Sequence, residues 1–227
     1  MLFISWWTRP SAEYQAYCLQ QTSSGSFNYD PKHRNATSKA PFSNEDCQEL
    51  IKAGYAINHT RMRLGSGLQT YKKAKQLIDK WRHFQLKWAS VESSTCIRAG
   101  ERFCVCSQEL FSWVSMPLEI LYVNNYEASN GIQPFPSYSP AGLASPSKVS
   151  KLKAAYCFGS GTLQGHLLAG EERFSVELDD DDTVWYEVLS FSRPAHFLSS
   201  LARPYVYHKQ KLFARQSTQA MLKAVSE

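Results

Sequence analysis

The chain has no run of about 20 apolar residues, so no segment is long and apolar enough to cross a membrane as a helix. Its first residues, Met1 to Trp7, carry no basic lead, and their apolar stretch is too short for a secretory signal. We therefore expect an intracellular protein. A net charge of +5 on 227 residues is small for a nucleic-acid-binding protein, and we expect no nucleic-acid partner.

The six cysteines lack the spacing of a zinc site. Cys104 and Cys106 are separated by a single residue, whereas zinc-binding pairs commonly have two residues between them. On a strand, this spacing places both thiols on the same face. We expect free, buried cysteines in a reducing compartment, and no metal or cofactor.

The composition is that of an ordinary globular protein, with 43% hydrophobic and 20% charged residues. Aromatic residues make up 13%, which suits an interior of large rings or an apolar cavity. The chain is long enough to bury a sizeable core, and we expect one domain over residues 1–227. Residues 127–153 are rich in serine and proline and lack periodicity, so we expect a disordered insertion loop there.

The last third of the chain carries the clearest pattern. Apolar and polar residues alternate over 171–178, which predicts a strand with one buried face and one face in water. An aspartate-rich loop at 179–183 and a second strand at 184–191 complete a predicted antiparallel hairpin. The loop lacks the ligand pattern of a calcium site. The face expected to be buried carries Phe174, Val176 and Leu178, and the face expected to be wet carries Arg173, Ser175 and Glu177.

Two amphipathic helices are predicted. Apolar residues recur every three or four positions from Leu68 to Phe84, and a long helix closes the chain from Pro204 to about Val225. Both helices have basic residues on their other faces. Pro117 is expected to end a regular element, and Gly159–Gly161 is expected to form a turn. Shorter strands are expected near 2–7, 55–64, 88–91, 101–108 and 118–124.

This order of elements predicts an α+β fold: a curved antiparallel β-sheet gripping a long C-terminal helix (helix-grip-like), with one further amphipathic helix. An arrangement of this kind leaves an elongated space between sheet and helix. Such a space is suited to an apolar ligand.

Seven short motifs resemble a known family over nearly the whole chain. They are Phe27–Asp30, Gly65–Gly67, Trp81–Phe84, Gly161–His166, Ala169–Glu172, Trp185–Glu187 and Phe191–Phe197. The sequence is similar to the uncharacterised family known as domain of unknown function 1990, also called uncharacterised protein family 0548, and especially to its plant branch. The resemblance implies no established reaction. It implies a place at the chloroplast outer envelope or in the cytosol, and a pore-forming, cation-conducting role suggested for plant relatives.

His166, Glu171 and Glu172 form the densest polar cluster. A histidine beside two carboxylates could perform general acid–base chemistry or hold a metal, and a structural hydrogen-bond network is the favoured alternative. Successive residues of a strand point to opposite faces, so at most one of the two glutamates can share a pocket with His166.

Gly65, Ser66 and Gly67 precede the first amphipathic helix, with Arg61 nearby. They could cradle a phosphate or carboxylate at the start of that helix, and the favoured alternative is a cap formed by Ser66. No lysine follows the second glycine, so this is not a nucleotide-binding loop. The basic faces of the two helices could contact anionic lipid, although such faces are more often only solvated.

Three functions are expected, the first and third from these patterns and the second only from the family resemblance. The first is a non-enzymatic binding module that holds a small apolar or amphipathic molecule between sheet and helix. The second is a pore at the plastid outer envelope, although the strands are shorter and more charged than a transmembrane barrel needs. The third is an enzyme that uses His166 and a glutamate. A homo-oligomer is left open. The ligand-binding candidates are Arg61, His166, Glu171, Glu172, Tyr186 and His196.

Overall fold

The computed structural model describes residues 2–127 and 152–227. Within these ranges, eight antiparallel strands form one sheet in the order β2-β8-β7-β6-β5-β4-β3, and β1 pairs with part of β5. The predicted insertion at 127–153 lies outside the described residues, apart from its ends in β5 and β6. The strands are β1 Phe3–Trp6, β2 Ala56–Ser66, β3 Ala89–Ser90, β4 Arg102–Glu109, β5 Ser112–Glu127, β6 Leu152–Thr162, β7 Leu168–Asp179 and β8 Thr183–Pro194.

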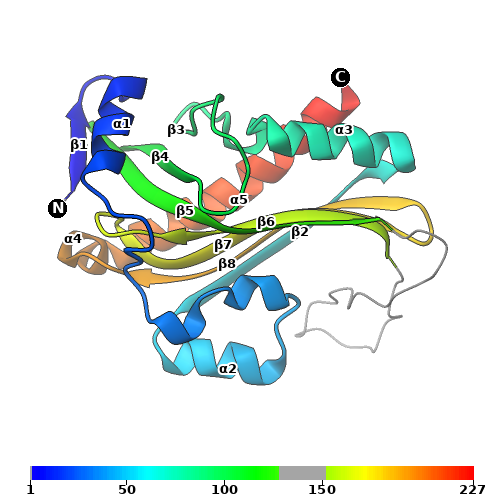
Figure 1. Ribbon diagram of the computed structural model, residues 1–227, viewed down its shortest axis with the longest axis horizontal. Coiled ribbons are helices and arrows are strands. Elements are labelled where there is room, and N and C mark those ends of the chain that lie inside the picture. Colours follow the sequence, from blue (N-terminus) through cyan, green and yellow to red (C-terminus); the bar gives the residue numbers. More distant parts are fainter. Residues whose placement is uncertain (1, 128–151) are drawn as a thin grey trace.

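Helices cover both faces of the sheet (Figure 1). The long helix α5 and the helix α3 lie on one face, and α2 lies on the other. The predicted α+β, helix-grip-like fold is therefore confirmed. No helix among the described residues is long and apolar enough to cross a membrane. The helices are α1 Ala12–Gln20, α2 Asn44–Lys52, α3 Leu68–Asp79, α4 Phe197–Leu201 and α5 Arg203–Ser226, with 3₁₀ turns at Pro31–His33, Ala36–Lys39 and Arg82–Phe84.

The main core lies between the sheet and the two helices α3 and α5. Phe158 and Phe174 project from the sheet and pack against each other, and Phe158 also packs edge-on against Trp81, which is fully buried. The helix predicted over 68–84 ends earlier, at Asp79, because Trp81 adopts a left-handed backbone with φ of 55°. This turn directs both Trp81 and Phe84 into the core, whereas a continuous helix would place them on neighbouring turns of its surface.

The polar face of β7 is buried, so the prediction that it is wet was wrong. Arg173, Ser175 and Glu177 are all buried. The face is closed because opposite charges from three strands meet: Arg173 Nη1 lies 2.7 Å from Glu187 Oε1 on the neighbouring β8, and Arg61 on β2 reaches across β8 to pair with Glu177. The alternation correctly separated the apolar face from the polar face. The charged side chains of the polar face form ion pairs with one another, so this face is buried and not exposed to water as predicted.

Pro117 lies within β5 and does not end it, contrary to the prediction. On one edge, residues 112–119 of β5 pair with β4, and Pro117 lies opposite Cys104. On the other edge β1 pairs with 112–115 and β6 pairs from Leu118 onward. Pro117 falls between these two pairings, where no backbone N–H is required for a ladder hydrogen bond.

Gly159 and Gly161 also lie within a strand, β6, where a turn was predicted. The strand uses glycine there because large rings pack directly on its backbone. A Cβ atom on Gly159 would lie 2.4 Å from the ring of Tyr122, and one on Gly161 would lie 2.5 Å from the hydroxyl of Tyr29. The predicted hairpin between β7 and β8 is confirmed, with its turn after Asp179.

A separate apolar cluster fixes α1 on the sheet. Cys104 and Cys106 lie on the same face of β4, as their spacing predicted, and pack with Cys18 of α1 and with Phe3. All six cysteines of the chain are free thiols, and four of them are buried. Burial raises the pKa of Cys106 to about 11, so this thiol is protonated and unreactive at neutral pH.

Candidate functional site

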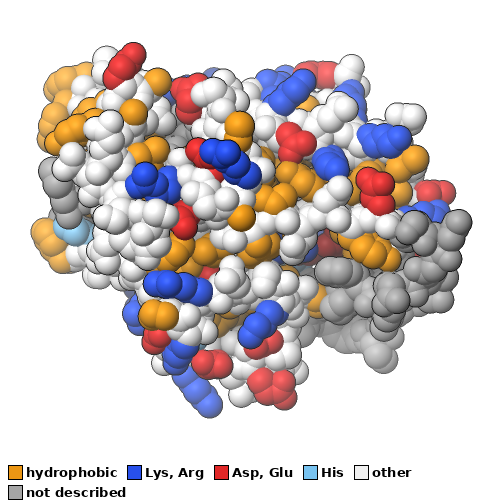
Figure 2. Space-filling model, viewed as in Figure 1, with side chains coloured by type: hydrophobic (Ala, Val, Ile, Leu, Met, Phe, Trp, Pro, Cys, Tyr) orange, Lys and Arg blue, Asp and Glu red, His pale blue; other side chains and the backbone are white. Residues whose placement is uncertain are grey.

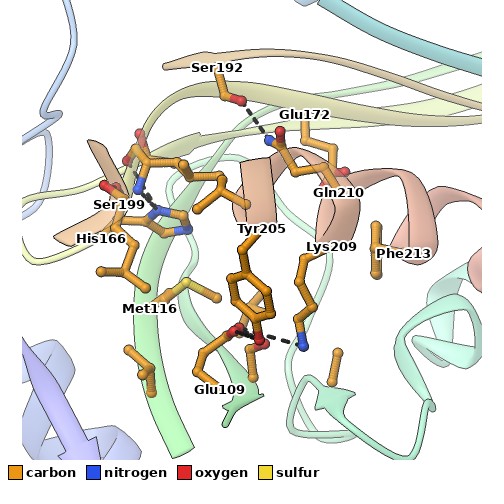
Figure 3. A pocket seen from close by; sticks show the side chains of 18 of the residues that line it. Glu109, Met116, His166, Glu172, Ser192, Ser199, Tyr205, Lys209, Gln210 and Phe213 are labelled. Atoms are coloured by element: carbon orange, nitrogen blue, oxygen red, sulfur yellow. Dashed lines mark hydrogen bonds and ion pairs between the residues drawn. The ribbon is translucent and has the colours of Figure 1, made fainter. Parts of the chain in front are cut away.

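A cavity of about 650 Å³ lies between the sheet and α5. Its wall combines side chains from the sheet, the 3₁₀ turn after α3, and the helices α4 and α5 (Figure 3). The wall is mainly apolar, and few polar groups reach it. Apolar lining residues include Phe84, Val105, Met116, Leu118, Val188 and Phe213. A cavity of this size and character accommodates a small organic molecule.

Glu172 is the acidic side chain that β7 directs into this cavity. It shares the face of Phe174, and it lies between Ser160 of β6 and Ser190 of β8 in the sheet register. Among the described residues, no donor or cation contacts its carboxyl group. Burial raises the pKa of Glu172 to about 8 from 4.5, because no cation compensates the charged form. The cavity therefore contains a carboxyl group available to a ligand.

Near Glu172, the polar side chain of Gln210 comes from α5 (Figure 3). Its amide nitrogen donates a hydrogen bond to Ser192 Oγ at 2.6 Å, which ties α5 to β8. Asn58 and Thr60 of β2 line the same cavity. One part of an otherwise apolar wall can thus form hydrogen bonds.

His166 occupies another part of the wall, in the connection between β6 and β7. Its Nδ1 lies 2.9 Å from the backbone nitrogen and 3.0 Å from the carbonyl oxygen of Leu168, which fixes the ring. The second ring nitrogen is directed toward the cavity (Figure 3). Burial lowers the pKa of His166 to about 4, so the imidazole is neutral at physiological pH.

A polar clasp joins the β4–β5 hairpin to α5 beside the cavity. Tyr205 donates a hydrogen bond to Glu109 Oε2 at 2.7 Å, and Lys209 donates to the carbonyl oxygen of Gln108 at 2.9 Å. The Lys209 ammonium also lies 3.7 Å from Glu109 Oε1 and 3.7 Å from the centre of the Trp88 ring. Burial lowers the pKa of Lys209. Its charge is satisfied by the protein and is not directed at Glu172.

The clasp and Gln210 were missed by sequence reasoning. Tyr205, Lys209 and Phe213 are spaced by four residues, so they form one stripe of α5. That spacing was the available signal, but a lysine within an apolar stripe was assigned to the solvated face. The partners on the β4–β5 hairpin are far away in sequence: Gln108 is 101 residues from Lys209, and Glu109 is 96 residues from Tyr205.

Glu171 lies on the other face of β7, as alternation requires. Its carboxylate accepts hydrogen bonds from Tyr29, from the backbone nitrogens of Asn35 and Thr37, and from the hydroxyl of Thr37, at 2.7 to 3.0 Å. These bonds hold the segment between α1 and α2 against the sheet. Of the two glutamates in the predicted cluster, Glu172 is the one directed into the cavity with His166.

Three other predicted site residues lie away from this cavity. Arg61 is on the opposite face, paired with Glu177 and Glu187 and 4.9 Å from the Trp185 ring centre. Tyr186 is fully buried, and its hydroxyl is 2.7 Å from Ser217 Oγ of α5. His196 lines a smaller polar hollow that His166 also borders.

The Gly65–Gly67 segment forms neither the anion cradle nor the cap by Ser66 that the sequence suggested. Ser66 is the last residue of β2, and Gly67 is the helix cap, without a capping side chain. The predicted cap by Ser66 was therefore wrong. Arg61 is engaged on the polar face of the sheet, and Gly67 N–H donates to the carbonyl oxygen of Asp182 at 2.7 Å. No anion cradle is formed by these groups.

Comparison with solved structures finds distant likenesses. A hypothetical protein from Helicobacter pylori is 13% identical, and the match covers 90% of this chain and 96% of that one with a TM-score of 0.43. This likeness is in the arrangement of the chain alone.

Sequence relatives are much closer. An Arabidopsis thaliana protein of uncharacterised protein family 0548 is 43% identical over 226 residues, covering 100% of this chain and 99% of the relative. A Dictyostelium discoideum member is 29% identical over 181 residues, covering 76% of this chain and 74% of the relative. The family described as domain of unknown function 1990 matches residues 41–220, which include β2 to β8 and most of α5. The chain belongs to this family.

Proposed function

We propose that this protein is a binding module that holds a small apolar or amphipathic molecule in the cavity between the sheet and α5. The observation that carries this proposal is the cavity itself: about 650 Å³, with a mainly apolar wall and the unpaired carboxyl group of Glu172 within it. A tightly packed interior would have closed a space of this size, because unfilled apolar volume destabilises a fold.

The distribution of polar groups favours an amphipathic ligand. The apolar body of the ligand would lie against Phe84, Met116 and Phe213. Its polar group would lie near Glu172 and Gln210, or near the free nitrogen of His166, because these are the groups that can form hydrogen bonds without breaking existing ones. Within residues 2–127 and 152–227 no free cation lies beside Glu172, so a neutral head group suits this position better than an anionic one.

Binding of a neutral apolar fluorophore, N-phenylnaphthylamine, tests the proposal. Ala214 of α5 is buried and lines the cavity, so the variant Ala214→Phe would place a ring inside it. We expect this variant to bind the fluorophore at least about tenfold more weakly than the wild type, since part of the buried apolar contact is lost. Native mass spectrometry of protein purified from its source tissue would identify a bound molecule.

The variant Gln219→Phe is the matched control. Gln219 is exposed on the same helix, so the same ring is added outside the cavity. Circular dichroism establishes that both variants are folded. Equal fluorophore binding by wild type, Ala214→Phe and Gln219→Phe would contradict the proposal, because binding would then occur elsewhere.

The described residues offer no specific support for the alternative functions. His166 makes no recorded hydrogen bond to either glutamate, and its fixed nitrogen contacts the backbone. No group of three or more metal-ligating side chains is found in the described ranges. A reaction, a pore, a plastid-envelope location and a homo-oligomer remain predictions from sequence.

A further inference from the structure

Large apolar side chains are exposed together at one end of the molecule. They come from β1 and the residue after it, from the turn between β4 and β5, and from α4. We refer to these six residues as the apolar rim. They are Trp6 (64% exposed), Trp7 (82%), Leu110 (76%), Phe111 (77%), Phe197 (71%) and Leu201 (82%).

The apolar rim surrounds one opening of the cavity. Trp6, Leu110, Phe111 and Leu201 also line the cavity, so the exposed apolar surface continues into its wall. Pairing of Trp6 with Ser112 brings β1 beside the β4–β5 turn. Figure 2 shows apolar side chains gathered at the end of the molecule where Figure 1 places β1 and α4.

The backbone holds two of these side chains outward. Trp7 and Leu110 have positive φ angles of 74° and 52°, which are unfavourable for residues other than glycine. Each of these two residues therefore has two unfavourable features: a strained backbone conformation, and an apolar side chain exposed to water. A contiguous exposed surface of this kind indicates an interaction site.

The charges beside the apolar rim are mainly basic. Arg9 and Lys87 are exposed and adjacent, since the Arg9 guanidinium donates to the Lys87 carbonyl oxygen at 3.4 Å. Arg203 is exposed two residues after Leu201. The nearby carboxylate of Glu109 is paired with Lys209 and Tyr205, and Glu13 is an exposed acid on the neighbouring helix α1. This balance favours an anionic partner.

We propose that the apolar rim docks the protein on the surface of an anionic lipid membrane, with the cavity opening facing the acyl chains. Tryptophan, phenylalanine and leucine side chains from three separate elements, flanked by arginine and lysine, suit the boundary between head groups and acyl chains. Docking would let an amphipathic molecule enter the cavity without crossing water. That last role depends on the proposed ligand-binding function, whereas docking itself does not.

This location differs from the basic faces of α3 and α5 considered from sequence. Those faces supply charge, and the large apolar side chains exposed on the two helices, such as Leu68 and Leu222, are each less exposed than any residue of the apolar rim. The apolar rim supplies both, and it is continuous with a cavity. A protein partner would seal that opening, whereas a bilayer leaves it in contact with apolar molecules.

Vesicle flotation tests the proposal with the intact protein. Vesicles of phosphatidylcholine alone are compared with vesicles of an equal mixture of phosphatidylcholine and phosphatidylglycerol. We expect binding to the mixed vesicles, weaker binding at high salt, and a blue shift of the fluorescence of the exposed tryptophans. Each of the variants Trp7→Ser, Phe111→Ser and Leu201→Ser is expected to lower the partition coefficient about tenfold, since one inserted side chain is lost.

Ile51→Ser is the matched control, because Ile51 is also a large exposed apolar residue, 61% exposed, but lies on α2 on the other side of the sheet. It should bind vesicles as the wild type does. No binding of the wild type to mixed vesicles would overturn the proposal, and so would rim variants that bind as strongly as the wild type. A dimer in solution that the rim variants dissociate, without vesicle binding, would assign the rim to contact between copies instead.

The docking and the cavity can fail separately. Trp7→Ser should leave binding of N-phenylnaphthylamine in solution unchanged, because Trp7 is not part of the cavity wall. Ala214→Phe should leave vesicle flotation unchanged. A wild-type protein that floats with vesicles but does not bind the fluorophore would contradict only the ligand-binding proposal. A wild-type protein that binds the fluorophore but does not float would contradict only the docking proposal.

Discussion

Glu171 and Glu172 are adjacent in β7, yet their carboxyl groups lie on opposite faces of the sheet and differ in their hydrogen bonding. The carboxylate of Glu171 accepts four hydrogen bonds from the segment 29–37. No partner is recorded for Glu172 among the described residues, and it lies in an apolar cavity. The first glutamate is therefore a structural element, and the second is a candidate contact for a ligand.

The variant Glu171→Gln should destabilise the protein strongly. One oxygen of Glu171 accepts from Tyr29 and Asn35, and the other accepts from both donors of Thr37. An amide supplies one acceptor oxygen and replaces the other by a donor, which leaves at least one buried N–H without a partner. We expect a loss of about 2–4 kcal/mol in the free energy of unfolding, measured by denaturant titration. Glu172→Gln is the control, and a comparable loss in both variants would contradict the different roles.

Stability should fall as the pH rises from 6.5 to 8. The pKa of Glu172 is about 8 in the folded protein and near 4.5 when unfolded, so the folded state binds more protons between these values. Stability then decreases with increasing pH, by about 1.4 kcal/mol per pH unit at most. The buried His83 and His166 have lowered pKa values, of about 3 and about 4, and they act in the opposite direction below 6.5. Other groups with shifted pKa values, such as Glu171 and Lys209, are shared with the variant Glu172→Gln, so the difference between wild type and variant above pH 6.5 reports on Glu172.

Unfolding free energies of wild type and Glu172→Gln, measured across this window, check the prediction. The variant cannot lose a proton at this position, so its stability should be nearly constant from pH 6.5 to 8. If the unfolding free energy of the wild type is also constant from pH 6.5 to 8, the carboxyl group of Glu172 ionises at a lower pH than its burial predicts. A water-filled connection to the outside would be one physical reason for such a result.

Local patterns were sufficient to predict much of the fold. The alternation over 171–178 and the aspartate-rich loop predicted β7, β8 and their hairpin, and helical spacing predicted α3 and α5. The errors arose where tertiary contacts decide. Pro117 is tolerated because β1 and β6 pair with β5 on either side of it, and this cannot be inferred from a single segment. The buried polar face of β7 depends on partners from β2 and β8.

The candidate site was only partly predictable for the same reason. The spacing of His166 and the two glutamates indicated that one carboxyl group could share a pocket with the histidine. Residues that complete the cavity wall come from distant segments: Tyr205 and Lys209 contact the β4–β5 hairpin, and Met116 projects from β5. Their roles depend on how the sheet curves around α5. Sequence periodicity indicates which face of a helix is apolar, not which strand it meets.

Gly159→Ala should destabilise the protein by steric overlap. The added Cβ would lie 2.4 Å from the Tyr122 ring, far closer than van der Waals contact. Tyr122 would have to move, although its hydroxyl is 3.0 Å from Thr37 Oγ1 and contributes to the network around Glu171. We expect a loss of about 1–3 kcal/mol, measured by denaturant titration.

A double-mutant cycle separates this overlap from the intrinsic effect of alanine in a strand. In the background of Tyr122→Ala the space above Gly159 is open, so Gly159→Ala should then cost little or be slightly stabilising. Additive losses in the double variant would show that the ring is not the cause of the destabilisation.

The cavity should prefer a neutral head group over an anionic one on the same apolar chain. Dodecanol can exchange hydrogen bonds with the protonated carboxyl group of Glu172, whereas dodecanoate would bring a negative charge beside it, where the described residues offer no free cation. Burying an uncompensated charge is costly, so we expect dodecanol to displace N-phenylnaphthylamine at about tenfold lower concentration at neutral pH.

Glu172→Leu provides the decisive comparison for this preference. Leucine removes the group that forms a hydrogen bond with the alcohol, so dodecanol should bind more weakly and the difference in affinity between the two compounds should narrow. The exposed variant Gln219→Leu should retain the full difference. If Glu172→Leu also retains it, the head group lies elsewhere in the cavity, and the free nitrogen of His166 becomes the group to vary, because it is another polar atom directed into the same space.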